Sequence, residues 1–375
     1  MDSRYKDHVM IINYLIIVYS KLMGRIDMKV VLFGAYDGKA PRYRILKKGL
    51  KRNGVDVVEC NDRSKPILLR LLRLVKKHRY LEYDILLIGH VGQYVVPLAK
   101  LISRKIVVFD IFNSLYETIV VDRKLVQEGS FKAKMLFTLD KYSFKLSHLC
   151  IADTYQHKLY FSRAFNIEKS KFEVVYPGSD DDIFYPRRKS GDETFLILFV
   201  GSFLPLHGVS FIIRAAKMLE RYKDVRFHLV GHGQTYVEAT ELARQLNVKN
   251  ISFLPPVRYE DLPKYIAQAD VCLGIFGNTD KAKRVVPFKV FDALAMRKPV
   301  ITGDSPAVRE ILKNKENCLL CRMGDPKQLA DSIILLYEDR KLGEKIAKNG
   351  YKLFKKHFTI KSIGKKLKTI LNTLL

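Results

Sequence analysis

Short apolar runs alternate with amphipathic helical stretches along most of this 375-residue chain. Alternation of this kind is typical of βαβ units, in which each helix returns the chain to begin the next parallel strand. A chain of this length is also too long for one ordinary hydrophobic core. We therefore predict an α/β fold of two doubly wound domains with parallel sheets. The expected strands are 29–34, 55–60, 84–89, 105–111, 149–152 and 172–176, and then 195–200, 226–230, 251–254, 271–276, 299–302 and 317–321.

A turn-rich polar segment, VYPGSDDDIFYP at 175–186, separates the two series of strands. Clusters of Pro, Gly, Ser and Asp between periodic segments are typical of a linker. We interpret its three consecutive aspartates as linker and capping residues, and we predict no metal site. The predicted units are an N-terminal apolar extension at 1–27, a first domain at 28–185, a second domain at 186–350 and a basic helical tail at 351–375.

The composition favours an anionic partner. The chain has 66 Lys and Arg against 39 Asp and Glu, a formal net charge of +27. Such an excess suits nucleic acid, an anionic membrane surface or phosphorylated substrates. We disfavour nucleic acid because the basic residues are spread over both halves, without an aromatic platform or a recognition-helix motif. Five cysteines, mostly within strand-like runs, indicate a reducing compartment.

Two segments raise the question of a membrane. Residues 9–22 are mostly apolar, but this run is shorter than the roughly 18–20 residues that span a bilayer. The segment is interpreted either as a short interfacial helix or as an upstream extension with Met28 as the true start. The helix expected within 63–80 has leucines on one face and cations on another, which fits either contact with anionic lipid or packing on the core. We expect a cytoplasmic protein held peripherally on the inner face of the cell membrane.

Candidate functional residues follow from the rule that open α/β sheets bind ligands where strands end and helices begin. In the second half, the stretch 270–310 reads as strand, basic loop, helix and strand, and it places Arg284, Lys289 and Asp292 at such a point. In the first half, Asp110 and Asn113 follow the strand 105–111. We predict that these two are catalytic, although a helix cap is an alternative explanation for Asn113.

The loop after the first strand is a candidate acceptor site. Gly34 begins a glycine-containing loop, and Arg42 lies in the basic helix that follows. A helix N-terminus attracts phosphate, so this loop fits a substrate phosphate as well as it fits a simple tight turn.

Several motifs of the second half resemble those of retaining family-four glycosyltransferases, which belong to glycosyl transferases group 1 and have the GT-B fold. Phe199-Val-Gly-Ser with His207-Gly208 is similar to the opening loop of that family, and Leu229-Val-Gly-His-Gly233 to its second strand and turn. The run from Phe288 to Val300 is similar to its signature helix. The resemblance covers most of 172–350, whereas the first domain resembles the family mainly in its pattern.

The resemblance implies that the second domain binds a nucleotide-diphosphate sugar and the first domain holds the acceptor. It also implies transfer with retention, without metal or cofactor. The implied donor-binding residues are Gly201, Ser202, His207, Gly231, Gly233, Arg284, Lys289 and Asp292. From the basic charge and the two segments above, we expect a lipid-linked or glycan acceptor and a role in polysaccharide or glycolipid biosynthesis. The alternatives are a sugar-nucleotide epimerase of the same architecture and a non-enzymatic nucleic-acid-binding protein.

The chain departs from the family pattern at the donor site. The family commonly has two glutamates eight positions apart, where this chain has Arg284 and Asp292. Ser202 stands near an expected arginine, and His207 near an expected lysine. We hypothesise that Arg284 and Lys289 hold the donor phosphates instead, the alternative being that Arg284 is a solvated loop charge. Asp292 would contact the ribose hydroxyls.

Overall fold

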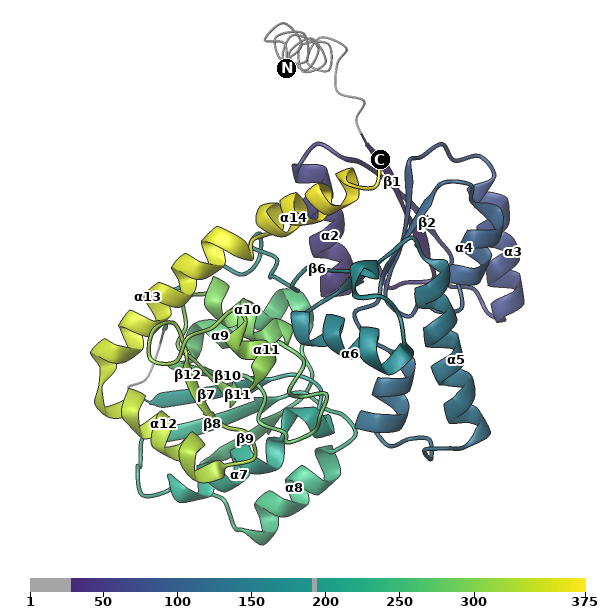
Figure 1. Cartoon of the computed structure of the whole chain (residues 1–375). Helices are drawn as coiled ribbons and strands as arrows, with labels where there is room; N and C mark the ends of the chain where they lie inside the picture. The colour runs from purple at the N-terminus through teal and green to yellow at the C-terminus, as the bar shows by residue number, and fades with distance from the viewer. Residues whose placement is uncertain (1–27, 191–193) are drawn as a thin grey trace, which may run out of the picture.

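Residues 28–190 and 194–375 are described by a computed structural model, so the predicted extension at 1–27 lies outside the described residues. The first domain is built on a parallel sheet of six strands in the order β2-β1-β3-β4-β5-β6 (Figure 1). Its strands are β1 Lys29–Gly34, β2 Asp56–Asn61, β3 Ile85–Ile88, β4 Ile106–Asp110, β5 Leu149–Ala152 and β6 Phe172–Val174.

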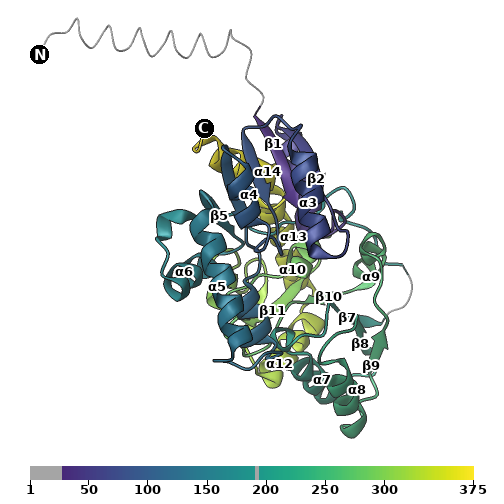
Figure 2. The same cartoon turned by 90° about the vertical axis from the view of Figure 1, so that its right-hand side faces the viewer.

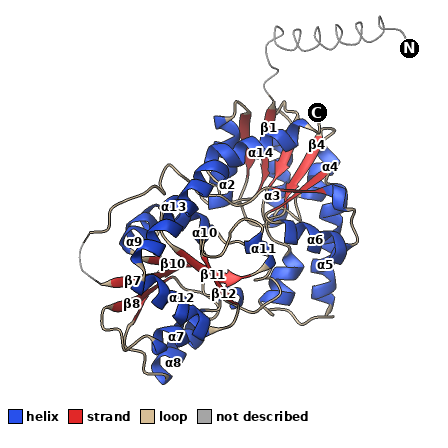
Figure 3. Ribbon diagram, turned by 60° about the vertical axis from the view of Figure 1, so that its left-hand side comes forward, coloured by secondary structure: helices blue, strands red, loops and turns tan. Residues whose placement is uncertain are grey.

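The second domain is built on another parallel sheet of six strands, in the order β12-β11-β10-β7-β8-β9. Figure 3 shows both sheets in red between blue helices. The prediction of two parallel-sheet α/β domains is therefore confirmed. The strands are β7 Phe195–Val200, β8 Val225–Val230, β9 Ile251–Leu254, β10 Val271–Leu273, β11 Val300–Asp304 and β12 Leu319–Arg322.

Helices cover both faces of the first sheet, which explains why its strands β3 and β5 are apolar at every position. Successive side chains of a strand point to opposite faces. Val30 and Leu32 of β1 accordingly pack with α2 and with α14 (Ile360–Asn372), whereas Val31 and Phe33 pack with α3, α4 and α5. The helices of this domain are α2 Pro41–Arg52, α3 Ile67–His78, α4 Val96–Ile102, α5 Phe131–Leu146 and α6 Tyr155–Phe165, with a π-helical segment at Glu117–Asp122.

The second sheet is covered in the same way. Helices α7, α8 and α12 pack on one face, and α9, α10 and α13 pack on the other. None of the described helices is long and apolar enough to cross a membrane. The helices are α7 Val209–Met218, α8 Tyr236–Gln245, α9 Leu262–Gln268, α10 Phe288–Ala295, α11 Pro306–Arg309, α12 Pro326–Glu338, α13 Arg340–His357 and α14 Ile360–Asn372.

The end of the chain returns to the first domain. In Figure 1, α13 and α14 run in yellow from the second domain to α2 of the first. The approach of α14 to α2 depends on two glycines, because a Cβ built on Gly49 would lie 2.8 Å from the Cα of Gly364. The aspartates of the linker also bind α2: Asp180 pairs with Lys48 at 2.8 Å, and Asp182 with the same lysine at 2.9 Å. Linker and tail thus fix the first domain against the second.

Candidate functional site between the two sheets

Two glycine loops touch at the carboxyl ends of β7 and β8. Gly201 follows β7 with φ +148°, and Gly231 follows β8 with φ +139°. A Cβ on Gly231 would lie 2.0 Å from the carbonyl oxygen of Gly201, so no side chain fits there. Gly233 is as tightly placed, since its Cβ would lie 2.6 Å from the backbone nitrogen of Phe203. Three of the predicted donor-binding glycines therefore lie together.

Lys289 reaches this glycine pair from the first turn of α10. Its Nζ lies 3.8 Å from the centre of the Phe199 ring, and a Cβ on Gly201 would be 2.7 Å from that Nζ. The Nζ atom is buried and makes no hydrogen bond within the described residues. Burial lowers the pKa of Lys289 well below its ordinary value. A buried amine without a hydrogen-bond partner lowers the stability of a folded protein. Its position beside two glycine loops therefore indicates a site where a ligand supplies the missing partner.

His207 completes this group on the side of the first glycine loop. Its buried ring donates from Nδ1 to the carbonyl oxygen of Ser202, which fixes the loop backbone. Burial, and then the nearby charge of Lys289, lower the pKa of His207 well below its usual range. The ring is therefore neutral at physiological pH. Ser202 contributes its backbone here, and the structure brings it together with Gly201, His207 and Lys289.

Asp292 lies one helical turn beyond Lys289 and contacts the interdomain linker. Its Oδ1 accepts a hydrogen bond of 2.6 Å from the hydroxyl of Ser179, and the carboxyl group is buried. Burial, opposed by the Ser179 hydrogen bond and aided by the nearby Asp180, raises the pKa of Asp292 to about 8. The predicted ribose contact stays a prediction, because Ser179 already occupies one of the two oxygens.

Asp292→Asn is expected to stabilise the protein at pH 8 and to remove a pH dependence. A carboxyl whose folded pKa is raised stabilises the fold at low pH, and that contribution is lost as the pH rises from about 4 towards 8. The free energy of unfolding of the wild type should fall over this range relative to Asp292→Asn, on the order of 1.4 kcal/mol per pH unit at most. Urea unfolding at pH 4, 6 and 8 measures this; parallel curves would show that Asp292 is ionised in the folded protein.

Arg284 points across the domain interface. Its Nε donates to Oε1 of Glu117 at 2.8 Å, and its guanidinium lies 4.0 Å from the centre of the Tyr160 ring. Its side chain is 18% exposed, which disfavours the alternative of a solvated loop charge. The phosphate contact hypothesised for Arg284 stays a prediction, since the described contacts of its side chain are to the first domain.

Glu117 belongs to a buried charge cluster, which we define as Asp153, His157, Glu117 and Arg284. His157 contacts Asp153 Oδ1 with its Nδ1 at 2.5 Å, and its Nε2 lies 3.3 Å from Oε2 of Glu117. Against the effect of burial, these two carboxylates raise the pKa of His157 to about 9. His157 in turn, with Lys281 and Arg284, holds the pKa of Glu117 at about 2 although burial opposes this. His157 and Glu117 are therefore both charged at neutral pH.

The predicted residues of the first domain are engaged with other side chains. Arg42 binds Asp110 with two hydrogen bonds, Nη2 to Oδ1 at 2.7 Å and Nε to Oδ2 at 3.0 Å, and both side chains are buried. The amide oxygen of Asn113 accepts from Nζ of Lys281 in the second domain at 3.1 Å. Gly34 lies at the end of β1, where a Cβ would meet only Tyr36 within 4 Å. The roles predicted for these residues stay predictions.

Besides Glu117 and His157 of the charge cluster, sequence reasoning missed Phe112, His90 and Lys281 at this interface. Phe112 has φ +48°, a conformation that is strained for a bulky residue and is found at functional sites. Its ring centre lies 5.6 Å from that of His90 and 5.5 Å from that of Phe288 in the second domain. His90 follows the strand predicted at 84–89, so the strand-end rule that selected Asp110 would also have found it. Lys281 carried no such signal, because it lies in an irregular loop.

The second domain matches a known family. The family model for "Glycosyl transferases group 1" matches residues 181–353. An uncharacterized glycosyltransferase of Methanocaldococcus jannaschii is 26% identical over 188 residues, which are 50% of this chain and 50% of that protein. The D-inositol 3-phosphate glycosyltransferase of Kribbella flavida is 34% identical over 126 residues, covering 28% and 30% of the two chains. The chain thus spans about half the length, or less, of these relatives.

Solved structures extend the likeness to the first domain. HepE of Anabaena, in complex with UDP-glucose, has a TM-score of 0.70 and 18% identity, covering 92% of this chain and 100% of that one. Sucrose-phosphate synthase of Thermosynechococcus elongatus has a TM-score of 0.72 and 15% identity, covering 92% and 99%. At this identity the likeness establishes the fold, and it confirms the predicted GT-B arrangement of two parallel-sheet domains.

Proposed function

We propose that this chain is a glycosyltransferase that moves a sugar from a nucleoside-diphosphate donor to a lipid-linked or glycan acceptor, with retention and without metal. The observation that carries the proposal is the buried, unpaired Nζ of Lys289 beside the touching loops of Gly201 and Gly231. The family match over the second domain, and the UDP and UDP-glucose complexes of a protein with the same fold, support a nucleotide-sugar ligand at that place.

In this mechanism the leaving diphosphate accepts the electron pair of the broken sugar–oxygen bond. Lys289 and backbone N–H groups of the glycine loops would stabilise that negative charge, which is greatest in the transition state. The acceptor hydroxyl forms the new bond and gives its proton to a diphosphate oxygen. The acceptor would bind against the first domain, beside His90, Phe112 and Asn113. This chemistry needs cations and N–H donors rather than a general base.

A nucleoside diphosphate is expected to raise the melting temperature of the full chain, because a ligand that binds the folded state stabilises it by about 2.7 kcal/mol at a hundredfold excess over Kd. The measurement is a thermal-shift screen with UDP, GDP, ADP and their common sugar conjugates, with the parent nucleosides as controls. A chain that responds to none of the diphosphates would overturn the donor assignment. The epimerase alternative predicts conversion of the responding nucleotide sugar without an acceptor.

The outer face of α3 supports contact with an anionic membrane. Figure 2 shows α3 at the surface of the first domain. Leu68 is 66% and Leu72 is 59% exposed, and Leu74 is the fully buried residue of the helix. This exposure disfavours the alternative of a core-packing helix. Cations share the outer face with the leucines, as in helices that lie in the interface of anionic lipid: Arg73, Lys76 and Arg79. We propose the inner face of the cell membrane as the surface.

The variant Leu68→Glu/Leu72→Glu is expected to bind phosphatidylglycerol vesicles at least tenfold more weakly than the wild type. Two apolar side chains are lost from the contact and two negative charges are added to it. The matched control is Leu125→Glu/Val237→Glu, which adds the same two negative charges at exposed apolar residues outside α3 and its neighbour α4. Vesicle sedimentation measures the binding of both variants. An equal loss of vesicle affinity in the two variants would show that the change in net charge, and not the loss of the α3 surface, weakens binding.

A further inference from the structure

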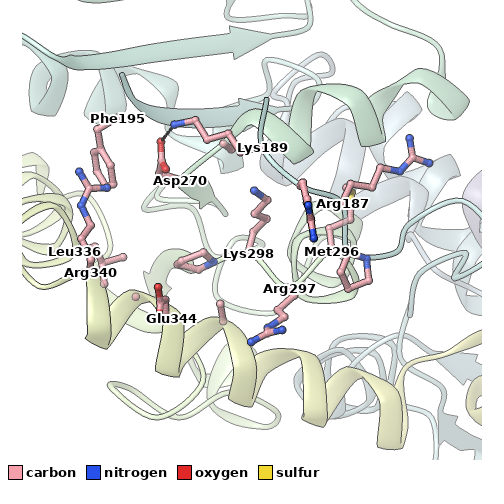
Figure 4. Close-up of a pocket in the computed structure, with 16 residues that line it drawn as sticks. Arg187, Lys189, Phe195, Asp270, Met296, Arg297, Lys298, Leu336, Arg340 and Glu344 are labelled. Carbon is pink, nitrogen blue, oxygen red and sulfur yellow. Dashed lines mark hydrogen bonds and ion pairs between the residues drawn. The ribbon is translucent and has the colours of Figure 1, made fainter. Parts of the chain in front are cut away.

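A basic cavity lies on the edge of the second sheet opposite to the glycine loops. Its volume is about 620 Å³, within the range of ligand sites. Phe195 begins β7, and Asp270 and Pro299 directly precede β10 and β11, so the cavity opens at the amino ends of these strands. The glycine loops of the donor site follow the carboxyl ends. Figure 4 shows the cavity between the linker, the strand ends and α13.

Cationic side chains dominate the lining of this cavity: Arg187, Arg188, Lys189, Arg297, Lys298 and Arg340. The lining acids are Asp270 and Glu344. Asp270 pairs with Lys189 at 2.6 Å and accepts from the backbone N–H of Leu196. Within residues 28–190 and 194–375, no ion pair joins the other five cations to a carboxylate. Like charges gathered around a concave surface repel one another, and a multivalent anion relieves that repulsion.

Four of these cations are held in place by contacts within the protein: Arg187, Lys189, Lys298 and Arg340. The guanidinium of Arg340 lies 4.1 Å from the centre of the Phe195 ring, which forms an apolar wall of the cavity. Nζ of Lys298 donates to the carbonyl oxygen of Ala267 at 2.6 Å. An anion would therefore meet charges that are already positioned, which lowers the entropy cost of binding.

Arg297 occupies a backbone conformation that favours glycine. Its φ is +54°, two residues after the end of α10, and its N–H donates to the carbonyl of Leu294. Helices commonly end in glycine at such a position, because a Cβ is strained there. Cations near a helix C-terminus do complement its dipole, but this accounts for Arg297 and Lys298 alone. It leaves unexplained the four cations from the linker and α13.

We propose that this cavity binds a soluble anion carrying two or more phosphate groups. Six cations are enough to contact several phosphate oxygens at once. A planar guanidinium can also donate two parallel hydrogen bonds to one phosphate group. The volume admits an oligophosphate and excludes a nucleic-acid duplex, whose width exceeds the cavity. The site is separate from the donor site, and the proposal does not depend on the proposed glycosyltransferase activity.

The test is calorimetric titration of the full chain with inorganic tripolyphosphate, in the wild type and in the Lys289→Met background that removes the donor-site cation. Saturable binding is expected in both. Arg297→Gly should weaken it at least fivefold, and Arg340→Ala should weaken it comparably. Lys315→Gly is the matched control, because it also replaces an exposed cation at positive φ, +59°, but lies outside the cavity. It should leave the affinity unchanged. Glycine adopts a left-handed backbone conformation without strain, so the Arg297→Gly and Lys315→Gly variants should both fold.

Three outcomes would overturn the proposal. The first is that no saturable binding occurs below millimolar tripolyphosphate. The second is that binding disappears with Lys289→Met and survives Arg297→Gly, which would place the anion at the donor site. The third is that Arg297→Gly reduces binding to phosphatidylglycerol vesicles while tripolyphosphate does not bind, which would make the cavity a lipid contact. Failure of nucleotide sugars to bind would contradict the proposed function and leave this site standing.

Discussion

Lys289→Met is expected to weaken nucleoside-diphosphate binding by about ten- to a hundredfold while raising the melting temperature of the free protein. A charge-assisted hydrogen bond contributes about 1.5–3 kcal/mol, and its loss gives that change in affinity. Stability should rise because the buried Nζ has no hydrogen-bond partner within the described residues, and methionine fills a similar volume without a polar group. Calorimetry with the nucleotide found in the thermal-shift screen, and thermal unfolding without ligand, measure the two effects.

The opposite signs of these two effects distinguish a ligand-binding lysine from a structural one. Lys281→Met is the matched control, because Lys281 is also buried but donates to Thr118 at 2.6 Å and to Asn113 at 3.1 Å. This variant should lose stability. Because burial lowers the pKa of Lys289, diphosphate binding should also be accompanied by proton uptake, visible as a buffer-dependent heat. If Lys289→Met lowered stability and left affinity intact, the donor assignment would be wrong.

The fold could be read from the sequence because its central strands, such as β3, β5 and β10, are fully buried. In β3, Ile85–Ile88, all four residues are buried and apolar, so the run stands out from the amphipathic helices around it. The glycines after β7 and β8 were found for a related reason. Where two backbones approach as closely as those of Gly201 and Gly231, no other residue fits, so the constraint is visible in the sequence.

Partnerships between distant side chains could not be read in this way. Arg42 and Asp110 are separated by 68 residues, and Arg284 and Glu117 by 167. Nothing in the local pattern of a charged residue indicates which opposite charge it will meet. A strand-end aspartate is the same in sequence whether it faces a substrate or an arginine. The return of α14 to α2 was hidden for the same reason, since an amphipathic helix does not specify its partner.

The pH profile of the buried charge cluster links these side chains to the contact between the domains. A raised folded pKa of about 9 means that the contribution of His157 is present below pH 6.5 and is lost as the pH rises through 9. The lowered pKa of Glu117 means that its contribution is present above pH 4.5 and is lost as the pH falls towards 2. The interface should therefore be most stable between about pH 4.5 and 6.5, and thermal unfolding from pH 4 to 10 measures this.

Glu117→Gln is expected to destabilise the protein by about 3–5 kcal/mol near neutral pH, because it leaves buried cations without their carboxylate. The cations are those of His157 and Arg284, both in direct contact with Glu117. In this variant the loss of stability on the alkaline side should begin at a lower pH, because Asp153 is then the one carboxylate of the cluster left to stabilise the charged form of His157.

Glu310→Gln is the matched control. Glu310 also makes contacts across the interface, but it accepts hydrogen bonds from neutral donors, including the hydroxyl of Tyr176 at 2.8 Å. It should cost on the order of 1 kcal/mol per hydrogen bond and leave the pH profile unchanged. Equal losses and identical profiles for the two variants would mean that the cluster is held by packing and not by charge.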